Sequence, residues 1–299
     1  MRLKHEFFDI IKAVKNRLER NIYKNSSMSY YWSSRYFPKG TRDDVFKLYS
    51  FLRVMSDYAR NVPVNIEHFE YIEQRWQSIK KDLQKKIVPT PINDTVDERV
   101  LANIAFIVYR HNCDPSWVDA YLKSMRLDLQ KRQYRGLKGT LDYMYGSSEV
   151  VGLMMARILN LPEEALKPAR MQGRAVQYIS MIRDIALDAQ AGRCYFPLSE
   201  IKKYGLKDLS QKEARLKPAM FTEFIHAQLL HYATWQAQAN HVVQYLPKRF
   251  KVPLQTAVDI YSQTANHIKN DPFSIYEQKL EPTKREVLKQ AIKRTVGKG

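Results

Sequence analysis

The stretch QYISMIRDIALDAQAGRCYFP, residues 177–197, decides the fold class more than any other part of the chain. Asp184 and Asp188 stand four positions apart, which places them on one helix face, together with Gln177 and Ser180. Like charges at this spacing repel unless something neutralises them, and Mg²⁺ is suited because it takes one or two carboxylates plus phosphate oxygens. The apolar flanks AVQYISMI and CYFP indicate that the stripe faces an interior, with a solvated helix face as the alternative.

A second polar stripe lies on VFKLYSFLRVMSDYARNV, residues 45–62. Arg53 lies in an otherwise apolar segment and needs an anionic partner, because a buried unpaired charge is costly. A bound diphosphate would serve, since a guanidinium matches phosphate oxygens bidentately; a salt bridge to a core acid is the equally weighted alternative. The polar residues on this side of the expected helix are Tyr49, Arg53, Ser56, Asp57 and Arg60.

A third segment, LDYMYGSSEVVGLMMARIL at residues 141–159, carries small residues inside a helical pattern. Glycine within a helix costs about 1 kcal/mol relative to alanine, so a packing or ligand reason is expected for Gly146 and Gly152. The close approach could be that of another helix or that of a ligand.

Helical patterning dominates the rest of the chain, with Pro and Gly concentrated between the periodic segments. There is no βαβ alternation and no G-x-G-x-x-G motif. We therefore predict an all-α protein, a single domain over residues 1–299, whose helices surround a central cavity able to hold a long apolar ligand. The expected helices cover residues 3–24, 42–60, 66–86, 96–111, 115–131, 137–158, 163–190, 210–246, 252–270 and 283–296.

Composition narrows the function classes. The chain has 299 residues, 44% of them hydrophobic, and only two cysteines, which cannot build a disulfide framework or a Cys-rich zinc site. No apolar run reaches the roughly 18 residues of a membrane span, and the first residues lack the apolar core of a secretory signal. These features predict a cytoplasmic protein.

The net charge of +18 admits three kinds of partner: nucleic acid, an anionic membrane surface or anionic small substrates. Nucleic acid is disfavoured, because the sequence has no zinc-finger spacing, no RNP-like aromatic motif and no separate basic tail. A basic surface would favour peripheral docking on anionic lipid, at about 1 kcal/mol per well-placed Lys or Arg. A merely solvated basic surface is the equally weighted alternative.

Taken in order and spacing, these segments resemble the squalene/phytoene synthase family of head-to-head prenyl transferases, over nearly the whole chain. GSSEVVGLMM is especially similar to microbial phytoene synthases. The matching parts are residues 27–30 with 36–38 (S-x-S-F…L-L-P), 42–53 (R…LYAF-x-R), 143–152 (Y-x-Y…VG), 177–197 (Q-x-x-N-x-x-R-D-x-x-x-D…GR-x-Y-x-P) and the tail 271–284.

The resemblance implies an isoprenoid-synthase-type helical fold and two prenyl diphosphates in one cavity. It implies ionisation of one allylic diphosphate, attack by the other substrate, and rearrangement of a cyclopropylcarbinyl diphosphate. Mg²⁺, with Mn²⁺ as an alternative, would be held by Asp184 and Asp188, which are catalytic together with Tyr143 and Gln177. No NADPH is expected, because no dinucleotide fingerprint is present. The substrate-binding residues implied are Ser27, Ser29, Tyr49, Arg53, Asp57, Arg60, Tyr145, Gly152, Ser180, Arg183, Arg193 and Tyr195.

Two departures from the family pattern bear on function. The first motif of the family reads D-D-x-x-D, whereas this chain has Ser56 and Arg60 at the outer positions and keeps only Asp57. Ser180 replaces the usual Asn of the second motif. In an active enzyme Arg60 would replace one ion electrostatically, although it would also repel an ion placed beside it.

Two hypotheses follow from different classes. The first is a phytoene-synthase-like transferase, with geranylgeranyl diphosphate favoured over farnesyl diphosphate and release of diphosphate. The second is a catalytically impaired relative that acts as a prenyl-lipid-binding or assembly module.

Overall fold

The structure is a computed structural model that describes residues 37–277, except for 62, 88–89 and 131–132, together with positions 280, 283, 285–286, 289–290 and 293–294. Ser27 and Ser29, which were assigned to substrate binding by resemblance, lie outside the described residues. The expected helix over residues 3–24 also lies outside them.

The first half of the described chain forms the helices that its apolar periodicity predicts. Side-chain caps fix where two of them begin: Asn65 accepts a hydrogen bond of 3.3 Å from the His68 amide, and Thr95 one of 3.4 Å from the Glu98 amide. The helices are α3 (Lys39–Arg60), α4 (Ile66–Gln84), α5 (Val96–Arg110) and α6 (Pro115–Gln130).

The middle of the chain forms two long helical segments, each interrupted once. The expected helix over residues 137–158 contains a single π-helical turn between two α-helices, and the expected helix over 163–190 is broken at Asp184. The elements are α7 (Leu137–Met144), η1 (Tyr145–Glu149), α8 (Val150–Ile158), η2 (Glu163–Ala165), α9 (Leu166–Arg183) and α10 (Ile185–Gln190).

The C-terminal part is more divided than the sequence predicts. The single helix expected over residues 210–246 is several elements, because Lys217 leaves the helical conformation and Pro218, which has no N–H to donate, starts a new helix. The elements are α11 (Leu198–Lys203), α12 (Gln211–Leu216), α13 (Pro218–Asn240), η3 (His241–Tyr245), α14 (Lys248–Asn270) and α15 (Ser274–Glu277).

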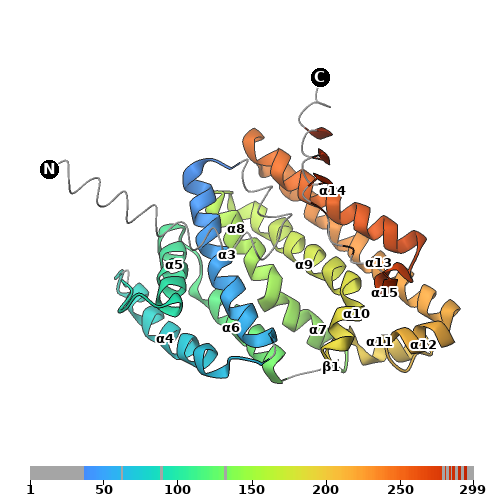
Figure 1. The fold of residues 1–299 in the computed structure, drawn as a ribbon. Coiled ribbons are helices and arrows are strands. Elements are labelled where there is room, and N and C mark those ends of the chain that lie inside the picture. The colour runs from blue at the N-terminus through green and yellow to red at the C-terminus, as the bar shows by residue number, and fades with distance from the viewer. Residues whose placement is uncertain are drawn as a thin grey trace.

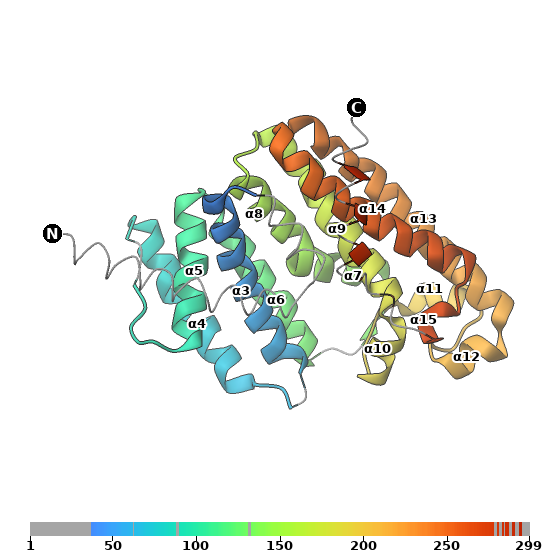
Figure 2. The ribbon, with the colours of Figure 1, turned by 45° about the horizontal axis from the view of Figure 1, so that its top comes forward.

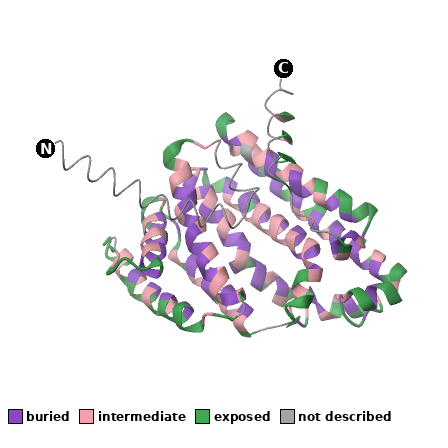
Figure 3. Cartoon of the chain, in the orientation of Figure 1, coloured by how far each residue is buried: buried purple, intermediate pink, exposed green. Residues whose placement is uncertain are grey.

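The helices form two groups around a shared middle. In Figures 1 and 2, α3, α4, α5 and α6 lie on one side, α13 and α14 lie on the other, and α8 and α9 run between them. Buried residues face inward along these helices, and exposed residues concentrate on the outer faces (Figure 3). The all-α expectation is confirmed for the described residues.

Close backbone packing joins the η1–α8 segment to α9. A Cβ at Gly152 would lie 2.2 Å from the carbonyl oxygen of Ala169, and one at Gly173 would lie 2.3 Å from that of Ser148. Real side chains do not tolerate such distances, so glycine at both positions lets the two helices touch. At Gly152 the structure therefore shows the approach of another helix, which is one of the two reasons expected for small residues in this segment; the other was the approach of a ligand.

One short parallel strand pair was not predicted. β1 (Gln133–Tyr134) pairs with β2 (Cys194–Pro197), and the Thr140 hydroxyl donates a hydrogen bond of 2.9 Å to the Tyr195 carbonyl oxygen. This pairing brings the chain that follows α10 against the chain that precedes α7. It thereby positions Tyr195 beside the site described below.

Candidate functional site

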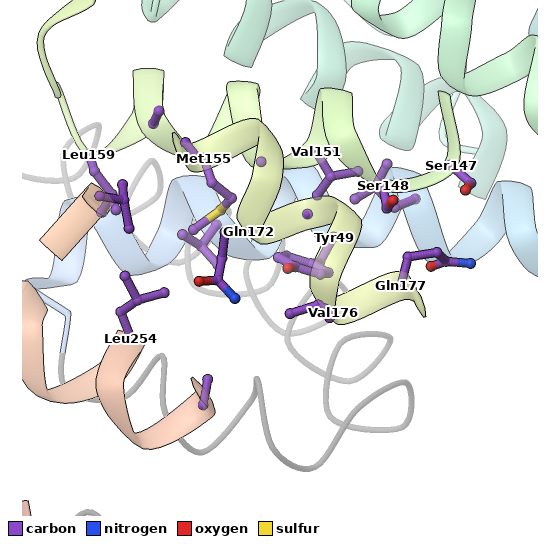
Figure 4. A pocket seen from close by; sticks show the side chains of 18 of the residues that line it. Tyr49, Ser147, Ser148, Val151, Met155, Leu159, Gln172, Val176, Gln177 and Leu254 are labelled. Atoms are coloured by element: carbon purple, nitrogen blue, oxygen red, sulfur yellow. The ribbon is translucent and has the colours of Figure 1, made fainter. Parts of the chain in front are cut away.

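A cavity of about 400 Å³ lies among α3, the η1–α8 segment, α9 and the η3–α14 region. Figure 4 shows Leu159, Met155 and Leu254 towards one end of it and Ser147 and Gln177 towards the other. The cavity thus has an apolar end and a polar end. Such a shape suits an amphiphilic ligand with a charged head and a hydrocarbon tail.

The polar end receives side chains from the last turns of α3. Arg53, Ser56 and Arg60 line the cavity there. Arg53 donates from Nε to the carboxylate of Asp57 at 2.8 Å, one helical turn further on. The only acid that this chain keeps of the first motif is therefore already paired with a cation.

Arg60 is held by a buried cluster on α6 and α7. Its Nε donates to Asp128 at 2.8 Å and its Nη2 donates to the Tyr143 hydroxyl at 2.5 Å. The Tyr143 and Tyr195 hydroxyls also donate to Asp128, at 3.0 and 2.8 Å, and their rings stack with centroids 4.9 Å apart. Asp128 and Tyr143 are 1% and 0% exposed. Burial raises the pKa of Tyr143 well above its usual range, so its hydroxyl remains a donor at neutral pH.

Asp128 is the central acceptor of this cluster, and sequence reasoning missed it. Its signal was available: Tyr121, Met125 and Asp128 follow one another at the spacing of a single helix face, and the first two are buried core residues. An acid on an apolar stripe requires a buried partner. That partner, Arg60, comes from α3, 68 positions earlier.

The second aspartate pair lies at the junction of α9 and α10. The helix is interrupted at Asp184, yet the amide of Asp188 still donates to the Asp184 carbonyl oxygen at 2.8 Å, which keeps the two residues on successive turns. Arg183 donates to both carboxylate oxygens of Asp184, each at 2.7 Å. Asp188 lies 3.7 Å from the guanidinium of Arg193.

Arg193 connects the two motif regions. Besides its contact with Asp188, it donates from Nη1 to the backbone carbonyl oxygen of Arg60 at 3.4 Å. The C-terminal end of α3 therefore lies against the chain that follows α10.

Asp188 has an unusual protonation equilibrium. Burial raises its pKa to about 6, and the neighbouring charges of Asp184 and Asp128 raise it too, while Arg60 and Arg193 oppose the shift. Because the charge of Asp184 raises the pKa of Asp188, a cation beside the pair would stabilise the ionised form of Asp188. Asp184 and Asp188 therefore fit a divalent ion that takes its remaining ligands from phosphate and water.

The first motif does not fit a metal ion in the same way. Ser56 offers a neutral hydroxyl, Asp57 is paired with Arg53, and Arg60 places a positive charge at the remaining position. Throughout the part of the chain that the structure describes, no three His, Cys, Asp or Glu side chains gather as a ready-made metal site. Within the described residues the second motif keeps two aspartates one turn apart, and the carboxylate of Asp184 is itself bonded to Arg183 through both oxygens.

The other residues assigned from the sequence fall into two groups. Tyr49, Gly152 and Gln177 line the cavity, as do Gln172, Ser147 and Ser148, which had no assigned role. The assigned residues that do not line it are Asp57, Tyr143, Tyr145, Ser180, Arg183, Arg193 and Tyr195. Tyr145, at the start of the π-helical turn, is 36% exposed.

Fold and cavity together define a helical protein that encloses an amphiphilic-ligand site, with the guanidinium groups of Arg53 and Arg60 among its lining residues. Asp184 and Asp188 are not among the residues that line the cavity. The model of the family "Squalene/phytoene synthase" matches residues 23–287, and the chain belongs to this family of prenyl transferases.

Two similar proteins are named 15-cis-phytoene synthase. The 15-cis-phytoene synthase of Pantoea ananas is 26% identical over 264 residues, which are 88% of this chain and 85% of that protein. The enzyme of the same name from Paracoccus sp. is 25% identical, over 86% of this chain and 83% of its own.

Solved structures share the fold, which confirms the isoprenoid-synthase-type expectation. A dehydrosqualene synthase crystallised with a ligand superposes with a TM-score of 0.75 at 18% identity, over 95% of this chain and 98% of its own. A squalene synthase from Alicyclobacillus acidocaldarius gives a TM-score of 0.73 at 15% identity, over 87% of this chain and 94% of its own. No helix within the described ranges is both long enough and apolar enough to cross a bilayer.

Proposed function

We propose that the protein condenses two prenyl diphosphates head to head and releases diphosphate, with geranylgeranyl diphosphate favoured over farnesyl diphosphate. The observation that carries the proposal is the cavity, which has cationic and hydroxyl side chains at one end and a hydrocarbon wall at the other. Family membership supports the same reaction class. The preference for the longer substrate draws support from the phytoene synthases among the relatives.

In this reaction the C–O bond of one allylic diphosphate breaks, and the diphosphate leaves with the electron pair. The double bond of the second substrate then attacks the carbocation, and loss of a proton gives a cyclopropylcarbinyl diphosphate. Loss of its diphosphate, rearrangement and loss of a second proton give the hydrocarbon product. Arg53 and Arg60 would bind phosphate oxygens and stabilise the charge of the leaving group. The apolar wall, with Leu159 and Phe250, would exclude water from the cation.

Asp184 and Asp188 are the proposed metal ligands, with Mg²⁺ as the expected ion and Mn²⁺ as an alternative. When bound, a divalent ion would supply positive charge to the diphosphate oxygens. Tyr143 and Tyr195 hold Arg60 through their shared partner Asp128, so we propose a positioning role for Tyr195 and either a positioning or a catalytic role for Tyr143. Gln177 would contact the substrate at the cavity wall.

The roles of the remaining substrate-binding residues, and docking on a membrane, are also proposals. We propose that Tyr49 and Gly152 contact the hydrocarbon part of a substrate, because both line the cavity. Ser180, Arg183 and Tyr145 would contribute only if a bound substrate extends towards them. Peripheral docking of the basic protein on anionic membrane is proposed from its net charge of +18 and from the apolar product of the reaction.

The proposal is tested by incubating the purified chain with geranylgeranyl or farnesyl diphosphate and Mg²⁺. We expect an organic-extractable product of twice the substrate's carbon number, together with released pyrophosphate, and faster turnover of the longer substrate. The Asp184→Ala/Asp188→Ala variant is the matched control. Product and pyrophosphate no higher than in that control would contradict the proposal.

One observation favours a second candidate, a prenyl-lipid-binding module without turnover. Ser56 and Arg60 remove two carboxylates at the α3 side of the cavity. A chain of this kind would bind geranylgeranyl diphosphate stoichiometrically and return it unchanged. Equilibrium binding measured beside the product assay distinguishes the two candidates.

A further inference from the structure

We infer that Arg60 takes the place of a metal ion at the α3 side of the cavity, so that this side binds a phosphate group directly through a guanidinium. The inference rests on the proposed function only in taking a prenyl diphosphate as the ligand. The second aspartate pair, Asp184 and Asp188, remains the place for a divalent ion. Binding of phosphate at the α3 side would then require no divalent ion.

Charge is the first argument. Relative to carboxylates at both positions, Ser56 and Arg60 make the α3 side three charge units more positive. One divalent ion brings two units, so the substitutions themselves supply more positive charge than an ion would. An ion placed beside Arg60 would be repelled, and the repulsion grows as the cavity excludes water.

Preorganisation is the second argument. The bonds from Arg60 to Asp128 and Tyr143 fix its guanidinium before any ligand arrives. Both partners are buried, whereas the Arg60 side chain is 31% exposed and lines the cavity. A cation held rigidly at a cavity wall loses little side-chain freedom when an anion binds.

Donor geometry is the third argument. An arginine has five N–H donors in a planar fork, and the two bonds described use two of them. Phosphate oxygens match the spacing of that fork. Arg53 lines the same cavity two helical turns earlier on α3, so two guanidinium groups face the proposed ligand from one helix.

The test uses the full chain, inorganic pyrophosphate as the probe, and titration calorimetry at physiological ionic strength in the presence of EDTA. We expect measurable binding without metal, and at least a tenfold loss of affinity in Arg60→Gln. Arg215→Gln, an exposed arginine on α12, is the matched control and should bind like the unmodified chain. Absence of binding in EDTA, or equal affinity in Arg60→Gln, would overturn the inference.

A second variant separates binding from folding, because Arg60→Gln leaves Asp128 buried without its cation. Arg60→Gln/Asp128→Asn removes both charges together. We expect it to lose pyrophosphate binding as the single variant does. If the double variant binds pyrophosphate like the unmodified chain, Arg60 serves only to neutralise Asp128, and the inference fails.

The outcome for the proposed function is read separately, in the product assay with Mg²⁺. Arg60-dependent pyrophosphate binding in EDTA without any product supports the guanidinium site and contradicts the transferase. Product formation together with pyrophosphate binding that strictly requires Mg²⁺ supports the transferase and contradicts the guanidinium site.

Discussion

Arg60 and Asp128, 68 positions apart in the chain, are joined by a hydrogen bond of 2.8 Å between a cavity-lining guanidinium and a carboxylate that is 1% exposed. The pair ties the last turn of α3 to α6. Tyr143 and Tyr195 donate to the same carboxylate, which satisfies both of its oxygens. The structure thus accommodates an arginine where the family motif has an acid, because a buried counter-charge stands opposite it.

The first prediction concerns this pair. Asp128→Ala should lower the free energy of unfolding by about 3 kcal/mol, because it leaves Arg60 without its counter-charge and two tyrosine hydroxyls without an acceptor. Urea denaturation followed by circular dichroism measures the change. Arg60→Gln/Asp128→Asn should recover a good part of the loss. A loss below about 0.5 kcal/mol in Asp128→Ala would show that the cluster contributes little to stability.

The second prediction concerns the metal. Asp184→Ala/Asp188→Ala should remove the Mg²⁺ dependence of prenyl diphosphate binding, because it removes both carboxylates proposed as ligands. Calorimetry with farnesyl thiodiphosphate, with and without Mg²⁺, measures it. Asp94→Ala/Asp142→Ala, which changes two exposed acids, is the matched control. Equal affinity with and without Mg²⁺ in the unmodified chain would refute the assigned metal role.

The third prediction concerns pH. The pKa of Asp188 is raised from 3.8 to about 6 in the folded chain, chiefly by burial, so between these values the folded state binds more protons than the unfolded state. Stability without metal should therefore fall as pH rises from about 4 to 6, and the loss should be complete above 6. Asp188→Asn should remove this dependence and stabilise the chain at pH 8 in EDTA by about 2 kcal/mol. Thermal unfolding across that pH range is the measurement, and an unchanged pH profile in the variant would count against it.

Much of the fold could be predicted from the sequence, because long amphipathic helices leave a strong periodic signal. α3 and α14 begin and end within a few residues of their predicted limits. The strands β1 and β2 could not be predicted, since segments of two and four residues carry no usable alternation. The break at Asp184 was also missed. It is a local interruption, and the Asp188 amide still donates to the Asp184 carbonyl oxygen across it.

The site was predictable only in part, for a physical reason. Arg53 and Arg60 lie on one helical stripe, and Gln177 lies in the second motif. Local spacing therefore identified all three as candidates. The partner of Arg60 comes from α6 and depends on how helices pack, which spacing within one helix does not encode. Sequence reasoning therefore found the cation and missed Asp128, the carboxylate that holds it.

The fourth prediction separates packing from substrate binding at Gly152. Gly152→Ala places a Cβ 2.2 Å from the Ala169 carbonyl oxygen, so α8 and α9 must move apart. We expect a loss of about 1–3 kcal/mol in unfolding free energy. Gly40→Ala is the matched control within a helix, since a Cβ there meets nothing within 4 Å, and it should be neutral or stabilising. Unchanged stability with weakened substrate binding in Gly152→Ala would assign this glycine to the ligand instead.

The fifth prediction tests the altered motif directly. Ser56→Asp/Arg60→Asp should create a divalent-metal site at the α3 side, because it restores two carboxylates beside the cavity. Without metal, the variant should be less stable than the unmodified chain, since a new carboxylate then lies beside the buried carboxylate of Asp128. Mn²⁺ titration and thermal unfolding in EDTA measure the two effects. Ser56→Asn/Arg60→Gln is the uncharged control, and it should gain no metal site.

Activity of the same variant distinguishes the functional hypotheses. In a dormant transferase, Ser56→Asp/Arg60→Asp should raise product formation at least about tenfold, which corresponds to about 1.4 kcal/mol in the barrier. In a binding module whose cavity has also changed, metal will bind and no product will form. If Arg60 has taken over phosphate binding, the unmodified chain will make product and the variant will be slower. That last outcome is the one that the Arg60–Asp128 pair favours, because the arginine is already fixed at the cavity wall before a substrate binds.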